Sequence, residues 1–357
     1  MTDRYHIHGV LPSGEQADLW VEAGKITYEP LAGAQTLATA GWILPGLVDA
    51  HCHVGIAAQA ATDQTTAEAN AKRNLASGVT LVREPGSPLD THWLDGQPGY
   101  PRFIRAGRHI ARTARYLRGY ANEVDPADLV EAVRTEARAG DGWVKLVGDW
   151  IDRDTGDLTA VWPEEIARQA ILAAHEEGAQ VTAHCFGEDS VAQLVAAGID
   201  CIEHGSGLDE STIKTMAERG TPLVPTLDNL KIFPGLADQA EAKFPIYAAH
   251  MRALYDRRHA VFLAAYEAGV PIYAGTDSGG FRAHGTILDE ILALATIGGP
   301  EFALAAASWR ARTWLGALNL EEGAPADLIV TGRNPHQDLT ALKELSLVMV
   351  AGVLATP

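Results

Sequence analysis

From residue 43 to about residue 315 the sequence alternates short apolar runs with longer amphipathic, alanine-rich segments. This repetition limits the fold more than any other feature, because it is typical of βα units that build a parallel sheet. Helix signals occupy Thr65–Ser77, Ala127–Ala139, Pro163–Glu177 and Asp189–Ala197. The strand-like runs are eight in number, namely Ile43–Asp49, Val79–Arg83, Arg102–Ala106, Trp143–Val147, Gln180–Ala183, Cys201–Glu203, Pro222–Thr226 and Pro271–Gly275. This count predicts a (β/α)8 barrel, and a doubly wound open sheet is the alternative.

The two ends of the chain carry a different pattern. Residues 5–31 alternate apolar and polar positions between glycines, which predicts short antiparallel strands. Ala326–Val330 and Leu347–Val353 are again strand-like, and a polar, turn-rich segment separates them. Neither end is large enough to bury a core alone. We therefore expect residues 1–42 and 316–357 to form one small discontinuous β domain, with residues 43–315 inserted as the barrel domain.

Composition argues against several classes of partner. The chain has 28 Lys and Arg against 46 Asp and Glu, a formal net charge of −18. Such a charge repels phosphate backbones and anionic lipid surfaces, so we expect neither a nucleic-acid nor a membrane partner. The N-terminus lacks a signal-peptide pattern and no apolar run is long enough to span a bilayer, which predicts a cytoplasmic protein. Cys52, Cys185 and Cys201 are odd in number and have apolar neighbours, which indicates reduced, buried thiols.

Ligand-type side chains recur where the predicted strands end, and the carboxyl ends of barrel strands are where active sites lie. Two residues spaced i, i+2 in an extended strand point the same way, so the first pair can offer both imidazoles to one ion. Imidazole and carboxylate groups are ligands that zinc and similar ions prefer. The predicted metal site consists of His51 and His53 after the first strand, Lys145 on the fourth, His184 after the fifth, His204 after the sixth and Asp277 after the eighth.

The order of these residues along the strands resembles the amidohydrolase superfamily. The resemblance covers nearly the whole chain, including the lead-in Leu44–His51 and the closing segment Gly323–Val330. Gly78–Arg83 and Val224–Leu227 are similar to the imidazolonepropionase-like branch, which includes Xaa-Pro dipeptidases. The resemblance implies an α/β fold, a (β/α)8 TIM barrel with a small β-sandwich domain formed by the N- and C-terminal segments.

Lys145 distinguishes a site for one ion from a site for two, because a protonated ammonium cannot bind a cation. The resemblance implies that Lys145 is carboxylated and that its carbamate bridges two divalent ions, with zinc the expected metal. Two ions about 3.5–4 Å apart can share an activated hydroxide. Alternatively, Lys145 pairs with Asp49 or Asp149 outside the site. For Asp277 the resemblance implies a metal ligand and the catalytic general base, and a helix N-cap at Asp277 or Ser278 is the alternative.

Candidate substrate-binding residues follow the third and eighth strands. Arginines recur every three or four residues from 102 to 118, and arginine matches carboxylates bidentately. If that stretch is helical, Arg112 or Arg115, with Tyr116 or Tyr120, would bind the free carboxylate of a substrate. The alternative is that these arginines pair with acidic helices. Tyr116 stands where the family often has a histidine, and His284 resembles the His-Gly segment after strand eight, as a substrate contact or a packing residue.

The sequence therefore predicts a binuclear metal-dependent hydrolase that attacks an amide-type C–N bond with a metal-bridging hydroxide. We expect a small-molecule substrate, a dipeptide (as for a prolidase) or an N-acyl amino acid, and a homo-oligomeric assembly. One alternative is a mononuclear deaminase or imidazolone-type cyclic amidohydrolase, for which His51, His53, His204 and Asp277 suffice and Lys145 has no use. Another is a non-catalytic barrel that serves as a binding module, against which the retention of all six ligand-type residues argues.

Overall fold

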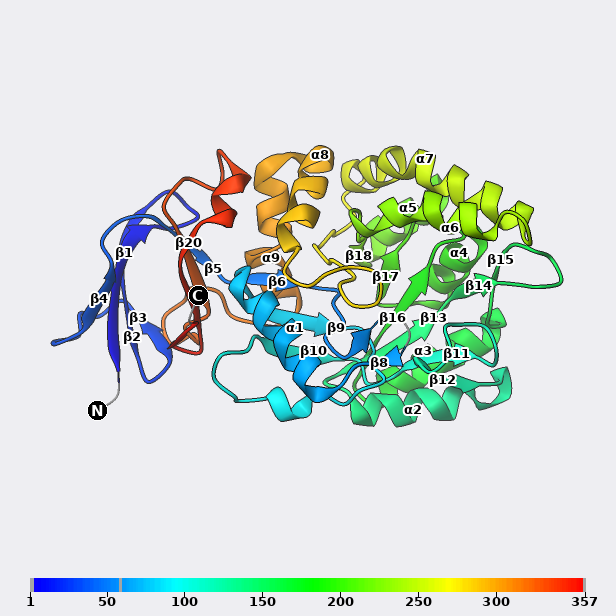
Figure 1. Ribbon diagram of the computed structural model, residues 1–357, viewed down its shortest axis with the longest axis horizontal. Helices are drawn as coiled ribbons and strands as arrows, with labels where there is room; N and C mark the ends of the chain where they lie inside the picture. The colour runs from blue at the N-terminus through cyan, green and yellow to red at the C-terminus, as the bar shows by residue number, and fades with distance from the viewer. Residues whose placement is uncertain (1–2, 58–59, 356–357) are drawn as a thin grey trace.

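The structure is a computed structural model that describes residues 3–57 and 60–355. Figure 1 shows strands from both chain ends gathered at one end of the molecule, with helices surrounding the strands of the long middle segment. The middle segment therefore leaves the terminal strands after β5 (Trp42–Pro45) and returns to them at β19 (Leu328–Thr331).

The terminal strands form one eight-stranded sheet, in the order β21-β20-β19-β5-β1-β2-β3 with β4 beside β1. β5 joins the two ends, since it pairs in parallel with β1 and antiparallel with β19. One buried hydrophobic cluster contains residues from both ends of the chain, among them Ile7, Leu19 and Leu328. The strands are β1 (Arg4–Val10), β2 (Gln16–Glu22), β3 (Lys25–Thr27), β4 (Gln35–Ala38), β5 (Trp42–Pro45), β19 (Leu328–Thr331), β20 (Leu345–Val350) and β21 (Val353–Leu354).

Parallel strands fill the middle segment, as the βα pattern predicts. One group, in the order β10-β9-β6, contains β6 (Leu47–Asp49), β9 (Val79–Glu84) and β10 (Arg102–Arg105). The other group, in the order β12-β11-β13-β16-β17-β18, contains β11 (His109–Arg112), β12 (Ala121–Val124), β13 (Trp143–Val147), β16 (Gln180–Cys185), β17 (Cys201–His204) and β18 (Leu223–Val224).

Residues 271–275, expected to be the eighth strand, lie between these two groups. A parallel bridge joins Ile272 to Leu223 of β18. On the other side, the backbone N–H of Ala50, just after β6, donates to the carbonyl of Ala274 at 2.9 Å. The segment therefore brings the end of the last predicted strand next to the end of the first.

Helices cover the parallel strands. The four predicted helices are present with bounds that differ by one or two residues, and α1 is capped by Asp63, whose carboxylate accepts from Thr66 N–H at 2.7 Å. No helix within 3–57 and 60–355 combines the length and apolar character needed to cross a bilayer. The helices are α1 (Gln64–Ala76), α2 (Leu129–Ala139), α3 (Glu164–Glu176), α4 (Glu188–Ala197), α5 (Glu210–Arg219), α6 (Phe233–Ala240), α7 (Pro245–Glu267), α8 (Ile287–Ala306) and α9 (Trp309–Trp314).

Short elements complete the chain. Four of the short strands pair as two hairpins, β7–β8 and β14–β15, near the predicted strand ends. The hairpin β14–β15 follows β13 and pairs Asp149 with Ala160. The short strands are β7 (Ile56–Ala57), β8 (Ala60–Ala61), β14 (Asp149–Ile151) and β15 (Leu158–Ala160), and the 3-10 helices are η1 (His92–Leu94), η2 (Pro126–Asp128), η3 (Asn229–Ile232) and η4 (Leu339–Lys343).

The structure departs from the sequence-based predictions in two of the longer connecting segments. Residues 102–118, where a helix would have aligned the arginines, contain the strands β10 and β11 instead. The segment 227–270, which is not among the predicted helices, contains α6 and α7. Helix α7 has Pro245 at its first turn and no further proline or glycine before Gly269, which is the composition that a long helix requires.

Candidate active site

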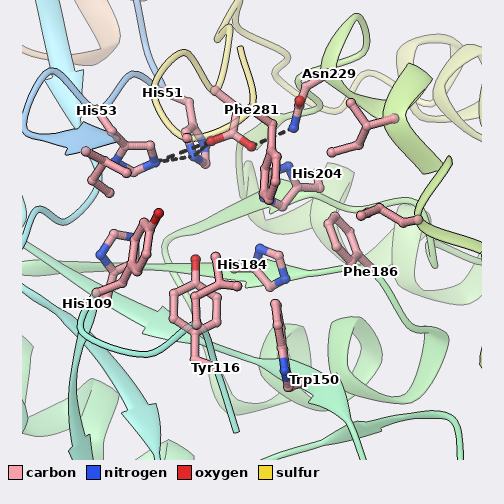
Figure 2. Close-up of a pocket in the computed structure, with 18 of the residues that line it drawn as sticks. His51, His53, His109, Tyr116, Trp150, His184, Phe186, His204, Asn229 and Phe281 are labelled. Carbon is pink, nitrogen blue, oxygen red and sulfur yellow. Dashed lines mark hydrogen bonds and ion pairs between the residues drawn. The ribbon is translucent and has the colours of Figure 1, made fainter. Parts of the chain in front are cut away.

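One pocket lies at the carboxyl ends of the parallel strands (Figure 2), and all six predicted metal ligands line it. The ligands lie on, or directly after, five different segments of the parallel sheet, so the fold brings together residues that are distant in sequence. The six are His51 and His53 after β6, Lys145 on β13, His184 on β16, His204 on β17 and Asp277 after residues 271–275.

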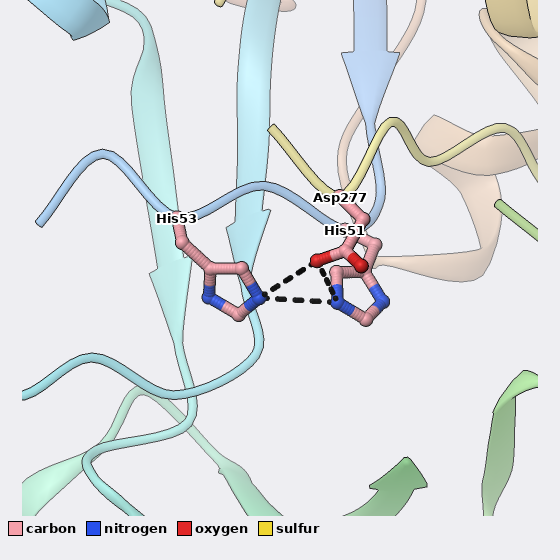
Figure 3. A group of neighbouring side chains, drawn as sticks. All are labelled: His51, His53 and Asp277. Atoms are coloured by element: carbon pink, nitrogen blue, oxygen red, sulfur yellow. Dashed lines mark hydrogen bonds and ion pairs between the residues drawn. The ribbon is translucent and has the colours of Figure 1, made fainter. Parts of the chain in front are cut away.

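His51, His53 and Asp277 form the tightest group (Figure 3). The two Nε2 atoms lie 3.1 Å apart, and Asp277 Oδ1 lies 3.2 Å from His51 Nε2 and 3.4 Å from His53 Nε2. The ring centroids of His51 and His204 are 5.1 Å apart, and those of His184 and His204 are 4.8 Å apart. The first three side chains could hold one ion, and the other two imidazoles lie beside them.

Three of the histidines are fixed through their Nδ1 atoms. His51 Nδ1 makes a short contact with the Glu203 carboxylate, and His53 Nδ1 lies 2.8 Å from the Gly86 carbonyl oxygen. His204 Nδ1 lies 2.7 Å from Thr226 Oγ1. A histidine that donates its Nδ1 proton to an acceptor keeps the Nε2 lone pair free, which is the usual arrangement around a metal ion.

Lys145 is 1 % exposed, and among residues 3–57 and 60–355 its Nζ atom has no hydrogen-bond partner. It pairs with neither of the aspartates considered from the sequence. Asp49 accepts from the hydroxyl and the N–H of Thr276 at 2.6 and 2.9 Å, and Asp149 accepts from the N–H of Phe186 at 2.7 Å. Burial lowers the pKa of Lys145, because the ammonium form loses its hydration. The alternative of a lysine paired outside the site is therefore wrong.

Three of the six non-glycine residues with a positive φ angle in the described part of the chain lie at the site. His204, Thr226 and Asp277 have φ angles of 65°, 46° and 54°, a region that costs a residue with a Cβ atom of order 1–3 kcal/mol. Asp277 is not a helix cap, because α8 begins only at Ile287. Burial alone would raise the pKa of Asp277, but the charge and hydrogen bonds of His51 and His53 lower it well below its usual range. Asp277 is therefore held ionised in a strained backbone position.

Glu203 and Arg83, which the sequence reasoning did not single out, form a charged layer beneath the ligands. Both side chains are fully buried, and Arg83 Nη2 donates to Glu203 Oε1 at 2.7 Å. The guanidinium carbon of Arg83 lies 4.7 and 5.0 Å from the ring centroids of Trp143 and Trp314. Charge pairing with Arg83 and His51 outweighs the cost of burial and holds the pKa of Glu203 well below its usual range. Glu203 thus reaches His51 as a carboxylate.

Two further pocket residues were missed. The ring centroid of His109 lies 5.3 Å from that of His53, and the Nδ1 atom of His109 has no partner. Asn229 Nδ2 donates to Asp277 Oδ2 at 2.6 Å. His109 follows the third predicted strand by three residues, so its position gave a signal comparable to that of the predicted ligands. Asn229 lies in η3 and carries no such signal.

The predicted substrate-binding residues divide into two groups. Tyr116 and Tyr120 line the pocket, whereas Arg112, Arg115 and His284 do not. Arg115 Nη1 donates to Asp152 Oδ2 at 2.6 Å, and its Nη2 donates to Thr159 Oγ1 at 2.7 Å, so its guanidinium braces the β14–β15 hairpin.

The other two residues outside the lining make only long contacts. Arg112 Nη1 lies 3.4 Å from the Val161 carbonyl oxygen, and His284 Nδ1 lies 3.6 Å from Cys52 Sγ. The three cysteines are free and buried, as predicted.

Comparison with known proteins identifies the family, since residues 42–355 match the amidohydrolase family model. The chain belongs to the amidohydrolase family. An uncharacterized protein of Mycobacterium tuberculosis is 51% identical over 354 residues, which cover 98% of this chain and 95% of that protein. The ochratoxinase of Aspergillus niger is 26% identical over 352 residues, covering 85% of this chain and 72% of the enzyme.

Among solved structures, a Xaa-Pro dipeptidase with methionine bound in its active site matches with a TM-score of 0.83. The sequences are 23% identical, and the match covers 99% of both chains. This amidohydrolase likeness implies a TIM-barrel-type α/β fold. The family indicates a hydrolase, and its members are generally metal-dependent.

Proposed function

We propose that this amidohydrolase is a binuclear metal-dependent hydrolase that cleaves an amide-type C–N bond. The observation that carries the proposal is Lys145, a buried amine without a partner in a pocket lined with imidazoles. A mononuclear deaminase would leave this lysine without a function at a cost in stability, because an unpaired buried polar group is unfavourable. As a carbamate, Lys145 would instead offer two oxygens to two ions.

The donor set fits two divalent ions, with zinc the first candidate. Four imidazoles and one carboxylate are ligands that zinc accepts. The lowered pKa of Lys145 favours a neutral amine, which is the form that can add carbon dioxide. In the proposed site His51, His53 and Asp277 would hold one ion, and His184, His204 and a carboxylated Lys145 would help to hold the second.

Two divalent ions, when bound, supply an activated water and polarise the scissile carbonyl. The chain itself moves the proton. Asp277 is ionised, and its Oδ1 atom faces the ligand histidines while Asn229 holds its Oδ2 atom. It can accept a proton from the attacking water and return it to the leaving nitrogen.

The proposal extends to the architecture that carries the site. We propose that the seven strands β6, β9, β10, β13, β16, β17 and β18 close with residues 271–275 as a (β/α)8 barrel, with residues 43–315 as the catalytic domain. Residues 1–42 and 316–357 would form the small β-sandwich domain, and the terminal sheet extends this boundary to Pro45, because all of β5 belongs to it. The contacts of residues 271–275 with β18 and with Ala50 support closure.

The test is a metal count on protein prepared with zinc or manganese and bicarbonate. About two ions per chain are expected for the unmodified chain, and Lys145→Ala should lose ions and amide hydrolysis together. The matched control is Lys214→Ala on α5, whose side chain is largely exposed and paired only with Glu218. At most one ion in the unmodified chain, or full activity in Lys145→Ala, would overturn the binuclear proposal. Partial recovery of Lys145→Ala by short carboxylic acids would identify the missing group as the carbamate.

A further inference from the structure

The half of the pocket away from the metal ligands is apolar. Figure 2 shows Tyr116, Trp150, Phe186 and Phe281 around the space in front of His184 and His204. Trp150 comes from the β14–β15 hairpin, Phe186 follows β16, and Phe281 lies before α8, so separate parts of the chain contribute one wall. Aliphatic and tyrosine side chains complete it, namely Ile56, Leu117, Tyr120, Ile151, Leu158, Ile232, Leu236 and Tyr247.

The aromatic wall is in contact with the ligand cluster. The ring centroids of Phe186 and His184 lie 4.3 Å apart, and those of Trp150 and His184 lie 6.0 Å apart. Tyr116 packs edge-on against Trp150 with centroids 4.9 Å apart. An acyl or amine group next to the scissile bond therefore meets these rings directly. The cavity of about 220 Å³ is large enough for an aromatic group, since roughly 150 Å³ already holds benzene.

Outside the ligand cluster and the ions proposed there, the described part of the pocket offers no cation to a free carboxylate. Lys145 is the only lysine or arginine in the lining, and it belongs to the ligand cluster. The nearby cations have other partners, since Arg115 pairs with Asp152 and Arg282 makes a short ion pair with Asp228. A carboxylate taken into such an apolar space would lose its hydration without a counter-ion.

The polar groups that remain free are neutral. Within residues 3–57 and 60–355 the hydroxyls of Tyr116 and Tyr247 have no hydrogen-bond partner, whereas Tyr120 donates to the Ala57 carbonyl oxygen. Burial raises the pKa of Tyr247 to about 12 and raises that of Tyr116 further, so both keep their protons at neutral pH. Such hydroxyls suit an amide or ether oxygen of the substrate.

Phe281 gives a second, independent indication. Its side chain is 61 % exposed although it lines the pocket, and it follows Gly279 and Gly280, whose φ angles are 112° and 49°. An exposed phenylalanine ring at a pocket mouth gains by covering apolar surface. A bound aromatic group would provide that surface.

We propose that the substrates are neutral amides with an aromatic or bulky apolar group beside the scissile bond and no free carboxylate in the pocket. This inference rests on the proposed amide hydrolysis, in which the hydroxyl of water joins the acyl carbon and its proton goes to the leaving nitrogen as the C–N bond breaks. It departs from the sequence-based expectation of dipeptides and N-acyl amino acids, which both carry a carboxylate.

The test compares two substrates that differ only in one carboxylate, N-benzoylphenethylamine and N-benzoyl-L-phenylalanine, with the metal-replete full chain. We expect kcat/KM for the neutral amide to be at least about 10-fold higher than for the acid. A buried charged group without a partner weakens binding by about that factor or more. An equal or higher kcat/KM for the acid would overturn the substrate class while leaving amide hydrolysis intact.

Two variants locate the preference in the aromatic wall. Trp150→Ala and Phe281→Ala should each lower kcat/KM for N-benzoylphenethylamine roughly 10-fold or more, the range for removing apolar pocket contacts. Phe281→Leu should retain most of the activity, and Leu172→Ala, an exposed apolar side chain on α3 outside the pocket, is the matched control. Losses no larger than those of Leu172→Ala would overturn the assignment.

A separate outcome is that the metal-replete chain hydrolyses neither amide, which would remove the proposed function. Calorimetric binding of the two compounds then decides the substrate class by itself. Tighter binding of N-benzoylphenethylamine, weakened by Trp150→Ala, would support the aromatic site. Absence of binding, or tighter binding of the acid, would overturn it.

Discussion

Replacing Glu203 with glutamine tests whether the charged layer beneath the ligands supports both the fold and the metal site. The Glu203 carboxylate accepts a hydrogen bond from Arg83 Nη2 on Oε1 and contacts His51 Nδ1 through Oε2, and all three side chains are buried. An amide keeps the shape but offers only one acceptor, so its NH₂ group must face either the guanidinium or the imidazole, which are both donors. It also leaves Arg83 without its counter-ion.

Two magnitudes follow for Glu203→Gln. Breaking a buried ion pair by removing one charge costs about 3–5 kcal/mol of unfolding free energy. Loss of the carboxylate behind a ligand histidine weakens metal binding about 10–100-fold, which corresponds to about 1.4–2.8 kcal/mol. Urea unfolding of the metal-free chain measures the first effect, and competition with a chelating indicator measures the second. Glu218→Gln on α5, whose side chain is exposed, is the matched control.

A double-variant cycle separates the pair from its members. Arg83→Met removes the opposite charge and keeps a flexible apolar side chain between Trp143 and Trp314. Combined with Glu203→Gln, it should recover part of the lost stability, because no uncompensated charge stays buried. An unfolding free energy for Glu203→Gln within about 0.5 kcal/mol of the unmodified chain would refute the reasoning, since that is the ordinary effect of surface changes. Strict additivity in the cycle would refute the pairing.

Three further predictions concern the proton shuttle, the close packing of the loops and a charged histidine. Asp277→Asn should lower kcat by about 10²–10⁴-fold while retaining most of the metal, and a variant with more than about a tenth of the activity would contradict the shuttle. In Gly207→Ala the new Cβ would lie 2.4 Å from the Gly187 carbonyl carbon, so the unfolding free energy measured in urea should fall by about 1–3 kcal/mol. In the control Gly235→Ala, on α6, the new Cβ would meet no neighbouring group of the described chain within 4 Å, so the unfolding free energy should rise by about 0.5–1 kcal/mol. The hydrogen bond to Glu188 raises the pKa of His250 to about 9, so the stability lost in His250→Gln should be largest below about pH 6.5 and vanish as the pH rises through 9 in urea titrations.

Sequence reasoning placed the strands and helices of the βα repeat well, because their signals are local. A buried parallel strand such as Trp143–Val147 is a continuous apolar run, and each following helix has its own periodicity. The same reasoning left out α7 and the strand β11. Their residues are compatible with several local structures, and tertiary packing decides among them.

The convergence of the six candidate ligands on one pocket was predictable for a related reason, since the carboxyl ends of parallel strands meet at one edge of the sheet. Their partners were not. Arg115 looked free because no acidic residue lies near it in the sequence, yet its partner Asp152 is 37 residues away, on the hairpin that carries Trp150. Glu203 lies beside a predicted ligand, but its contacts reach 120 residues back to Arg83 and 152 back to His51. Pair distances of this kind depend on the whole topology.

The same burial that folds the parallel strands also prepares the ligands for metal. Burial lowers the pKa of His184 to about 3 and lowers that of His53 and His204, so these imidazoles are neutral and do not have to release a proton at physiological pH. His51 is the exception, because Glu203 and Asp277 raise its pKa against the effect of burial. The same burial lowers the pKa of Lys145, which could not bind an ion as an ammonium. In the proposed binuclear site Lys145 would join the ligand set only after the addition of carbon dioxide, so we expect bicarbonate to limit the loading of that site with metal.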